Sequence, residues 1–253
     1  MKKSGKSLHR MSGKTAAFKI VNFLLDVIYP KRCPVCGDIV SKRGADICPK
    51  CEKKLNYVEE PYCLKCGKPL IDEREYCDDC CKKKHSYNEG RAVLCYDEVS
   101  SKSIYGFKYN SRQEYAKFYG RIMTEKLKRK IKAWNPDLIV PVPVHKSKLK
   151  TRGYNQAALI ARELSKSLKI PCRDDLVIRK SNTKVQKELN AKEREINLKK
   201  AFIVRENSVK LKSVLIVDDI YTTGSTIDSV ARCLKEKGVE NVYFVTLAIG
   251  RGI

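Results

Sequence analysis

Residues 214–226 read Val-Leu-Ile-Val-Asp-Asp-Ile-Tyr-Thr-Thr-Gly-Ser-Thr, and this stretch decides the fold. The four apolar residues at 214–217 are typical of a buried parallel strand in a sheet with helices on both faces. Asp218 and Asp219 follow at the carboxyl end of this strand, which is where open α/β sheets bind their ligands. The stretch therefore predicts an α/β fold with its binding site at this strand end.

A loop of hydroxyl-bearing residues and one glycine follows the acid pair and leads into a predicted helix. Backbone N–H groups, side-chain hydroxyls and a helix N-terminus together form an anion site, and Gly224 allows the backbone to approach a ligand closely. Carboxylates accept hydrogen bonds from sugar hydroxyls, so the two parts together suit a ribose 5-phosphate. The residues predicted to bind it are Asp218, Asp219, Thr222, Thr223, Gly224, Ser225 and Thr226.

This combination resembles the signature of the type I phosphoribosyltransferases, which bind 5-phosphoribosyl-1-pyrophosphate. In that family the two acids contact the ribose hydroxyls and the loop holds the 5-phosphate. The resemblance implies the same roles for Asp218, Asp219 and residues 222–226, with Mg²⁺ bound alongside phosphoribosyl pyrophosphate. Thr222 departs from the pattern, because purine-salvage members carry an acid there for proton transfer, which argues against a 6-oxopurine salvage enzyme.

From about residue 90 onward the chain alternates between strand and helix patterns, which is typical of a mostly parallel sheet. We predict a type I phosphoribosyltransferase-like α/β domain over residues 90–253, with helices on both faces of the sheet. The predicted strands cover 91–96, 137–140, 176–178, 202–204, 212–217 and 242–247. The predicted helices cover 112–131, 155–168 and 225–237, the last closed by Gly238.

Two cation-bearing segments lie near the predicted strand ends. Residues 145–152 form a basic loop without an acid after a Pro-Val-Pro-Val strand end, and residues 179–202 are polar and suit a mobile lid. Such cations can bind a pyrophosphate or a nucleic-acid backbone. The residues predicted for this role are His145, Lys146, Arg152 and Arg194 of these segments, together with Lys108 earlier in the chain.

Eight of the twelve cysteines form four Cys-x-x-Cys pairs, a metal-binding spacing in a chain with no evident export signal. The intervals repeat, with eleven residues between Cys36 and Cys48 and ten between Cys66 and Cys77. This repetition indicates a duplicated segment, a double zinc ribbon at residues 31–86. We expect two structural zinc sites, one from Cys33, Cys36, Cys48 and Cys51 and the other from Cys63, Cys66, Cys77 and Cys80.

The spacing is also compatible with interleaved pairing of the knuckles, and with Cys81 in place of Cys80. Redox-active pairs are the rival interpretation, but no thioredoxin-like βαβ pattern surrounds them. Because a segment of this length cannot build a core unaided, metal is expected to supply its folding energy.

The net charge of +24 favours polyanionic partners. Residues 1–14 are predicted to be a disordered basic tail, and residues 15–30 an amphipathic helix too short to span a bilayer. We expect a cytoplasmic protein without a transmembrane segment. The basic helix leaves open a peripheral contact with the inner face of the membrane.

The motifs together resemble the ComF (ComFC) family of competence-type proteins. The resemblance runs through the four knuckles, Phe107-Lys108-Tyr109, the Pro-Val-Pro-Val stretch, Arg152-Gly153-Tyr154-Asn155-Gln156, then Gln186, Arg194, Asn197 and Phe202, and the Asp-Asp signature. It implies a protein of DNA uptake and natural transformation that handles single-stranded DNA and binds phosphoribosyl pyrophosphate. Contact with the competence machinery is a further expectation.

Two functions are therefore compatible with the sequence. The first is single-stranded DNA handling on a phosphate-binding platform, where Tyr109, Tyr115, Tyr154 and Tyr221 are candidates for stacking on bases. The alternative is a phosphoribosyltransferase that moves phosphoribosyl from phosphoribosyl pyrophosphate to an unknown acceptor.

Overall fold

The computed structural model describes residues 30–41, 44–180, 201–205 and 210–250. The predicted tail at 1–14, the predicted helix at 15–30 apart from its last residue, and residues 181–200 of the predicted lid lie outside the described residues. Membrane and competence-machinery contacts stay predictions. Among the helices of the described part, none combines the length and apolar character needed to cross a bilayer.

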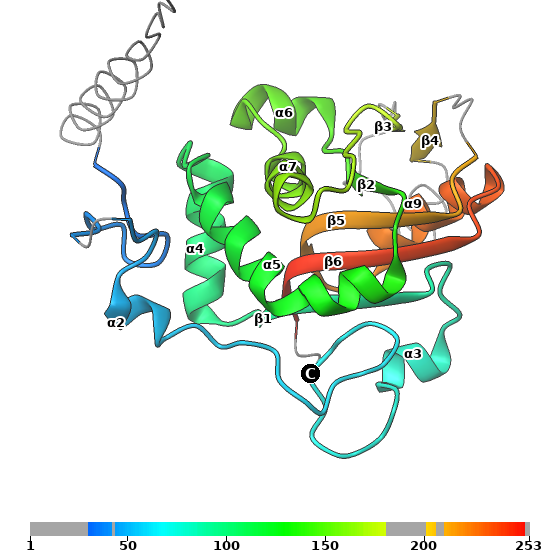
Figure 1. The fold of residues 1–253 in the computed structure, drawn as a ribbon, viewed down its shortest axis with the longest axis horizontal. Helices are drawn as coiled ribbons and strands as arrows, with labels where there is room; N and C mark the ends of the chain where they lie inside the picture. The colour runs from blue at the N-terminus through cyan, green and yellow to red at the C-terminus, as the bar shows by residue number, and fades with distance from the viewer. Residues whose placement is uncertain (1–29, 42–43, 181–200, 206–209, 251–253) are drawn as a thin grey trace, which may run out of the picture.

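The centre of the molecule is a four-stranded, fully parallel sheet (Figure 1). Its order is β1 (Glu89–Cys95), β6 (Asn241–Ile249), β5 (Ser213–Tyr221) and β2 (Leu138–Pro141). Because all the strands run the same way, their carboxyl ends lie at one edge of the sheet. The predicted fold class is confirmed, and the strand of the acid pair lies inside the sheet between β6 and β2.

Both edge strands of this sheet are covered by irregular segments. The backbone of residues 56–58 bonds to β1, with Val58 N donating to Val93 O at 2.9 Å. On the other side, Ile139 N of β2 donates to Pro171 O at 2.8 Å. Free strand edges invite pairing with other chains, so this cover satisfies backbone groups that four strands alone leave open.

Helices cover both faces of the sheet, as Figure 1 shows. On one face lie α5 (Tyr115–Trp134) and α7 (Gln156–Leu168), and on the other lies α9 (Ser225–Glu236). In α9 the buried residues Ile227, Val230, Ala231 and Leu234 follow the spacing of one helical face. Burial of such apolar faces against the sheet is the main stabilising force of this architecture.

Two further helices that the structure describes after residue 90 were not predicted. One is α4 (Glu98–Tyr109), which starts with a capping box in which Asp97 and Ser100 satisfy each other's backbone N–H groups. The other is α6 (Lys146–Arg152), so the prediction of a basic loop at 145–152 was wrong. The His145 side chain accepts from Ser147 N, and Gly153 ends α6 at φ +79°; these two caps support a short helix that lacks apolar periodicity.

A separate hairpin stands next to the main sheet. It pairs β3 (Val177–Arg179) with β4 (Phe202–Val204) in antiparallel fashion, and Phe202 packs in the same apolar cluster as α9. Its strands lie within one residue of the predicted ones. The segment that joins them is the predicted lid, most of which is not described.

The cysteine-rich segment consists of two copies of one backbone pattern. In the first copy Cys33 N donates to Asp38 O and Gly37 N to Cys33 O, and in the second Cys63 N donates to Lys68 O and Gly67 N to Cys63 O. Each copy closes with a short helix, α2 (Pro49–Glu52) in the first and α3 (Asp78–Lys82) in the second. The equivalent bonds, offset by thirty residues, match the predicted duplication.

Candidate functional site

The acid pair lies near the carboxyl end of β5, where both side chains are partly buried. Asp219 Oδ1 accepts from Lys108 Nζ at 2.9 Å, and Asp218 Oδ1 accepts from Asp219 N at 2.8 Å. Burial, together with the neighbouring charge of Asp219, raises the pKa of Asp218 to about 8. A ligand that donates hydrogen bonds here favours the ionised carboxylate and lowers this pKa again.

The loop after β5 offers donors that the described residues do not use. Gly224 is the N-cap residue of α9, and no side chain caps this helix. Thr222 and Thr223 are exposed, and the hydroxyl of Thr223 lies 3.0 Å from that of Ser225. Free N–H groups and hydroxyls at a helix N-terminus can hold an anion.

Gly224 is also required by packing. Its φ is +73°, and a Cβ at this position lies 2.3 Å from the hydroxyl of Tyr221. Both observations exclude a larger residue without movement of the loop. The sequence suggested close approach of a ligand as the reason for this glycine, whereas the structure adds a protein neighbour, the Tyr221 ring.

Residues 85–87, which follow the second ribbon, contact Tyr221 before the loop and Asp228 after it. The Tyr87 hydroxyl lies 2.7 Å from the Tyr221 hydroxyl, and both rings are buried. One turn into α9, the buried Asp228 contacts His85 Nδ1 at 2.6 Å and accepts from Ser86 N at 2.8 Å. These contacts fix the strand end and the first turn of α9, and no local sequence pattern predicted them.

The predicted cations lie in different places. Lys108 contacts the acid pair, whereas Arg152 donates to the Tyr109 hydroxyl at 2.8 Å, with its guanidinium 4.7 Å from the centre of the Tyr109 ring. His145 caps α6, and Lys146 is exposed on that helix. Arg194 lies outside the described residues. Of the four cations described, Lys108 alone reaches the acids.

A cation that the sequence did not single out lies near the acid pair. Burial lowers the pKa of Arg179 on β3, and the charge of Asp218 opposes that shift, so the two groups are close enough to interact. The Arg179 guanidinium also lies 5.5 Å from the centre of the Phe202 ring. The only hint in the sequence was its position at the start of the predicted lid.

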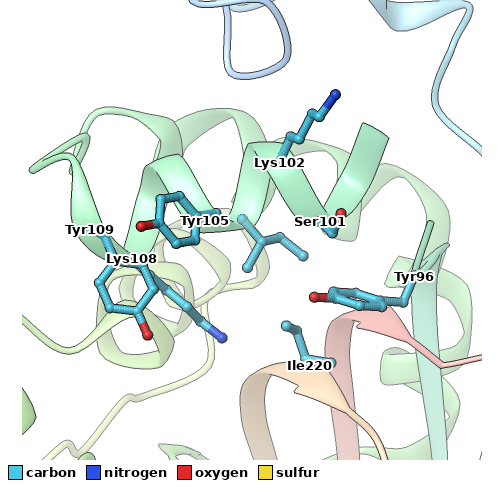
Figure 2. Close-up of a pocket in the computed structure, with 8 residues that line it drawn as sticks. Tyr96, Ser101, Lys102, Tyr105, Lys108, Tyr109 and Ile220 are labelled. Atoms are coloured by element: carbon cyan, nitrogen blue, oxygen red, sulfur yellow. The ribbon is translucent and has the colours of Figure 1, made fainter. Parts of the chain in front are cut away.

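A pocket of about 520 Å³ lies beside the acid pair, between α4 and the ends of β1 and β5 (Figure 2). Of the four tyrosines considered for base stacking, Tyr109 is exposed and lines this pocket. Tyr115, Tyr154 and Tyr221 are buried, so the prediction that they are stacking candidates was wrong. The lining residues are Tyr96, Ser101, Lys102, Ile104, Tyr105, Lys108, Tyr109 and Ile220.

The eight knuckle cysteines form two compact groups, each with its ligand atoms within 4.8 Å of one another. The groups are sequential, namely Cys33, Cys36, Cys48 and Cys51, then Cys63, Cys66, Cys77 and Cys80. Cys81 is exposed and lies outside the second group, with its Sγ 3.9 Å from Tyr76 O. The structure therefore favours sequential pairing of the knuckles and Cys80 over Cys81.

The two groups fit zinc. The Sγ atoms of Cys36 and Cys48 are 3.9 Å apart, and those of Cys66 and Cys77 are 3.7 Å apart. Tetrahedral zinc with bonds of about 2.3 Å places its sulfurs about 3.8 Å apart. Burial raises the pKa of Cys33, but the backbone N–H groups of Cys48, Cys36 and Val35 outweigh burial and lower it to about 7. In the same group, burial and the neighbouring thiols raise the pKa of Cys48 to about 11 and that of Cys51 to about 12, so zinc binding there must displace protons.

Comparisons with known proteins agree with these two parts. A family model described as a double zinc ribbon domain matches residues 24–81, and one described as a phosphoribosyl transferase domain matches residues 116–252. The chain is 34% identical over 224 residues to Competence protein F of Haemophilus influenzae, covering 86% of this chain and 96% of that protein. It is 30% identical to the DNA utilization protein YhgH of Escherichia coli K12 (84% and 94% covered) and 27% identical to Competence protein ComFC of Bacillus subtilis (78% and 81%).

The fold and the matched models define the class as a phosphoribosyltransferase-type domain that follows a double zinc ribbon. Within that class the similarity spans most of this chain and almost all of Competence protein F. The chain belongs to the ComF (ComFC) family of competence proteins.

Proposed function

We propose that this protein binds phosphoribosyl pyrophosphate at the end of β5 and handles single-stranded DNA. The observation that carries the first part is the juxtaposition of Asp218 and Asp219 with the uncapped N-terminus of α9. The acids suit ribose hydroxyls, and the helix N-terminus suits the 5-phosphate. These two chemical features lie at one carboxyl strand end, the preferred ligand position in open α/β sheets.

Each residue has a defined task in this proposal. The carboxylates of Asp218 and Asp219 accept from the ribose hydroxyls, and residues 222–226 donate to the 5-phosphate. Lys108 and Arg179 supply positive charge beside the acids, where a pyrophosphate needs compensation. Mg²⁺, when bound with the ligand, adds further compensation of the phosphate charge.

Two observations support the proposal of DNA binding, namely the positive charge of the protein and the names of similar proteins. The helix α6 exposes Lys146, Lys148 and Lys150 to solvent, and the chain as a whole carries a net charge of +24. Exposed lysines bind phosphates largely without sequence preference. Relatives carry the names competence protein and DNA utilization protein, which agrees with a nucleic-acid role.

Salt dependence tests the DNA part. The affinity for a single-stranded oligonucleotide should fall steeply with salt, and removing two phosphate contacts by Lys146→Ala with Lys150→Ala should reduce the log–log slope by about 1.4. The matched control is Lys128→Ala with Lys132→Ala, which removes the same charge from exposed positions of α5. A flat salt response of the unmodified protein contradicts DNA binding through phosphates.

A second candidate function is transfer of the phosphoribosyl group to an acceptor. The observation that favours it is the pocket beside Lys108, the partner of Asp219, which offers room for an acceptor next to the ribose site. The test is release of pyrophosphate from phosphoribosyl pyrophosphate across a panel of nucleobases and amines. Turnover that disappears with Asp218→Asn plus Asp219→Asn supports transfer, and no turnover with any acceptor counts against it.

A further inference from the structure

The pocket beside the acid pair is unusually rich in exposed aromatic surface. Tyr96, Tyr105 and Tyr109 line it with 42%, 60% and 52% of their surface exposed. In Figure 2 the hydroxyl of Tyr96 points into the pocket above Ile220, and Tyr105 and Tyr109 lie toward the opposite end. The buried Ile104 adds apolar surface to the lining.

These tyrosines are not part of the hydrophobic core. The helix α4 buries Ile104 and Phe107 on its inner side, while Tyr105 and Tyr109 stay exposed with ring centres 4.7 Å apart. Clustered exposed aromatic side chains mark binding surfaces. Tyrosine rings offer flat π faces at a low cost in conformational entropy, so a planar ring is the ligand that fits this surface.

The charges around the pocket indicate which kind of planar ligand it favours. Lys102 and Lys108 line it, but they are paired with Glu98 and Asp219, so the positive charge left for a phosphate comes from α6. The guanidinium of Arg152, on the basic helix α6, donates to the Tyr109 hydroxyl and lies over the Tyr109 ring. Cations at the rim favour a ring that carries phosphate, which is a nucleotide unit rather than a neutral aromatic compound.

We propose that this pocket holds one unpaired base of a single-stranded nucleic acid, stacked on Tyr105. The neighbouring phosphates then follow Arg152 and the exposed lysines of α6. The inference rests on the proposed DNA binding and adds to it a site that contacts a base instead of the backbone. Stacking tolerates any base, because every base has a π face.

The test compares an oligo(dT) strand with an abasic strand of the same length and charge. The unmodified protein should bind oligo(dT) more tightly. Tyr105→Leu should weaken oligo(dT) binding by about tenfold, the usual scale for one lost stacking contact, and should leave abasic binding unchanged. Tyr105→Phe keeps the ring and should keep the preference. Tyr76→Leu, at another exposed tyrosine, outside the pocket, is the matched control.

The outcomes separate this inference from the proposed function. Equal binding of the two strands, or an equal loss of both with Tyr105→Leu, overturns the base site while DNA binding stands. Failure of both strands to bind overturns DNA binding itself. Free thymidine forms a third arm. If free thymidine binds in a Tyr105-dependent way while the two strands bind equally, the pocket takes a free nucleoside and the strand assignment is wrong.

Discussion

The two zinc ribbons share one backbone pattern but meet different parts of the molecule. Cys33 and Cys51 of the first ribbon pack in the apolar cluster that contains α5 and α7, and the Tyr115 hydroxyl donates to Cys33 O at 3.2 Å. Cys63 and Cys66 of the second ribbon pack in the cluster that contains α9. The two copies therefore belong to the apolar clusters on opposite faces of the sheet, and α2 and α3 stand well apart in Figure 1.

The second ribbon also continues into residues 85–87, which hold Tyr221 and Asp228 at the phosphate loop. Within the described part of the chain, the contacts of the first ribbon with the rest of the protein lie on α5 and its surroundings instead. The difference shows that two copies of a duplicated metal module can have different structural roles. One copy supports a helix, and the other supports the loop proposed to bind the ligand.

The largest expected effect is loss of one metal site at a time. Cys66→Ser should abolish phosphoribosyl pyrophosphate binding, because structural zinc sites are worth on the order of 10 kcal/mol to the segments they fold. The equivalent change in the first ribbon, Cys36→Ser, should remove one zinc and leave the ligand affinity nearly unchanged. Metal analysis gives the zinc content of both variants, and calorimetric titration gives their affinity for phosphoribosyl pyrophosphate. Equal losses of affinity contradict the different roles of the two ribbons.

Next in size is a matched pair of glycines in the two knuckles. Gly37 and Gly67 have φ of +80° and +78°, but an added Cβ meets nothing within 4 Å at Gly37, whereas at Gly67 it lies 3.0 Å from Arg91 Cα and Gly90 O. Gly37→Ala should lower the free energy of unfolding by about 1 kcal/mol. Gly67→Ala should lower it by about 2–4 kcal/mol, because backbone crowding adds to the strain.

Urea denaturation of the zinc-loaded variants measures both values. A cost at Gly37 equal to that at Gly67 contradicts the closer packing of the second ribbon against β1.

A smaller effect is expected from two hydroxyl deletions. Tyr87→Phe removes the bond to Tyr221, and Tyr115→Phe removes the bond to Cys33 O. Each should destabilise the protein by about 1 kcal/mol. Only Tyr87→Phe should also weaken phosphoribosyl pyrophosphate binding, by up to about fivefold. Thermal denaturation and titration separate the two effects, and an unchanged affinity with Tyr87→Phe removes the proposed support of the loop.

A pH dependence is also expected at the β5 strand end, next to the loop that the second ribbon supports. The pKa of Asp218 rises from 3.8 to about 8 in the fold, so the folded state keeps a proton that the unfolded chain releases. Stability from this group therefore falls as pH rises from about 4 to about 8. Asp218→Asn should flatten that decline in thermal denaturation, whereas Asp38→Asn, at an exposed acid of the first ribbon, should not.

Much of the fold and of both metal centres could be predicted because their signals are local. The run Val214–Val217 has no polar residue and ends in two acids, which defines a buried strand and its binding edge. The cysteine spacing likewise defines two knuckles for each zinc, and the structure groups the thiols accordingly. Neither conclusion needed information about distant residues.

The missed elements depend on weak or distant signals. In α4 the serines, Gly106 and the tyrosines lower helix propensity, and its capping box uses Ser100 where Glu or Gln is usual. The pocket joins Tyr96, which follows β1, with Tyr105 of α4 and Ile220 of β5. Similarly, Arg179 lies near Asp218 through pairing of chain segments, which no local pattern reveals.

Calorimetric titration of Mg²⁺ and phosphoribosyl pyrophosphate into the zinc-loaded protein tests the central claim most directly. We predict saturable binding at one site per chain, and a loss of at least about tenfold in affinity with Asp218→Asn plus Asp219→Asn, because hydrogen bonds between ribose hydroxyls and charged carboxylates are lost. Absence of binding, or equal affinity of the variant and the unmodified protein, contradicts the assignment of the β5 strand end as the ligand site.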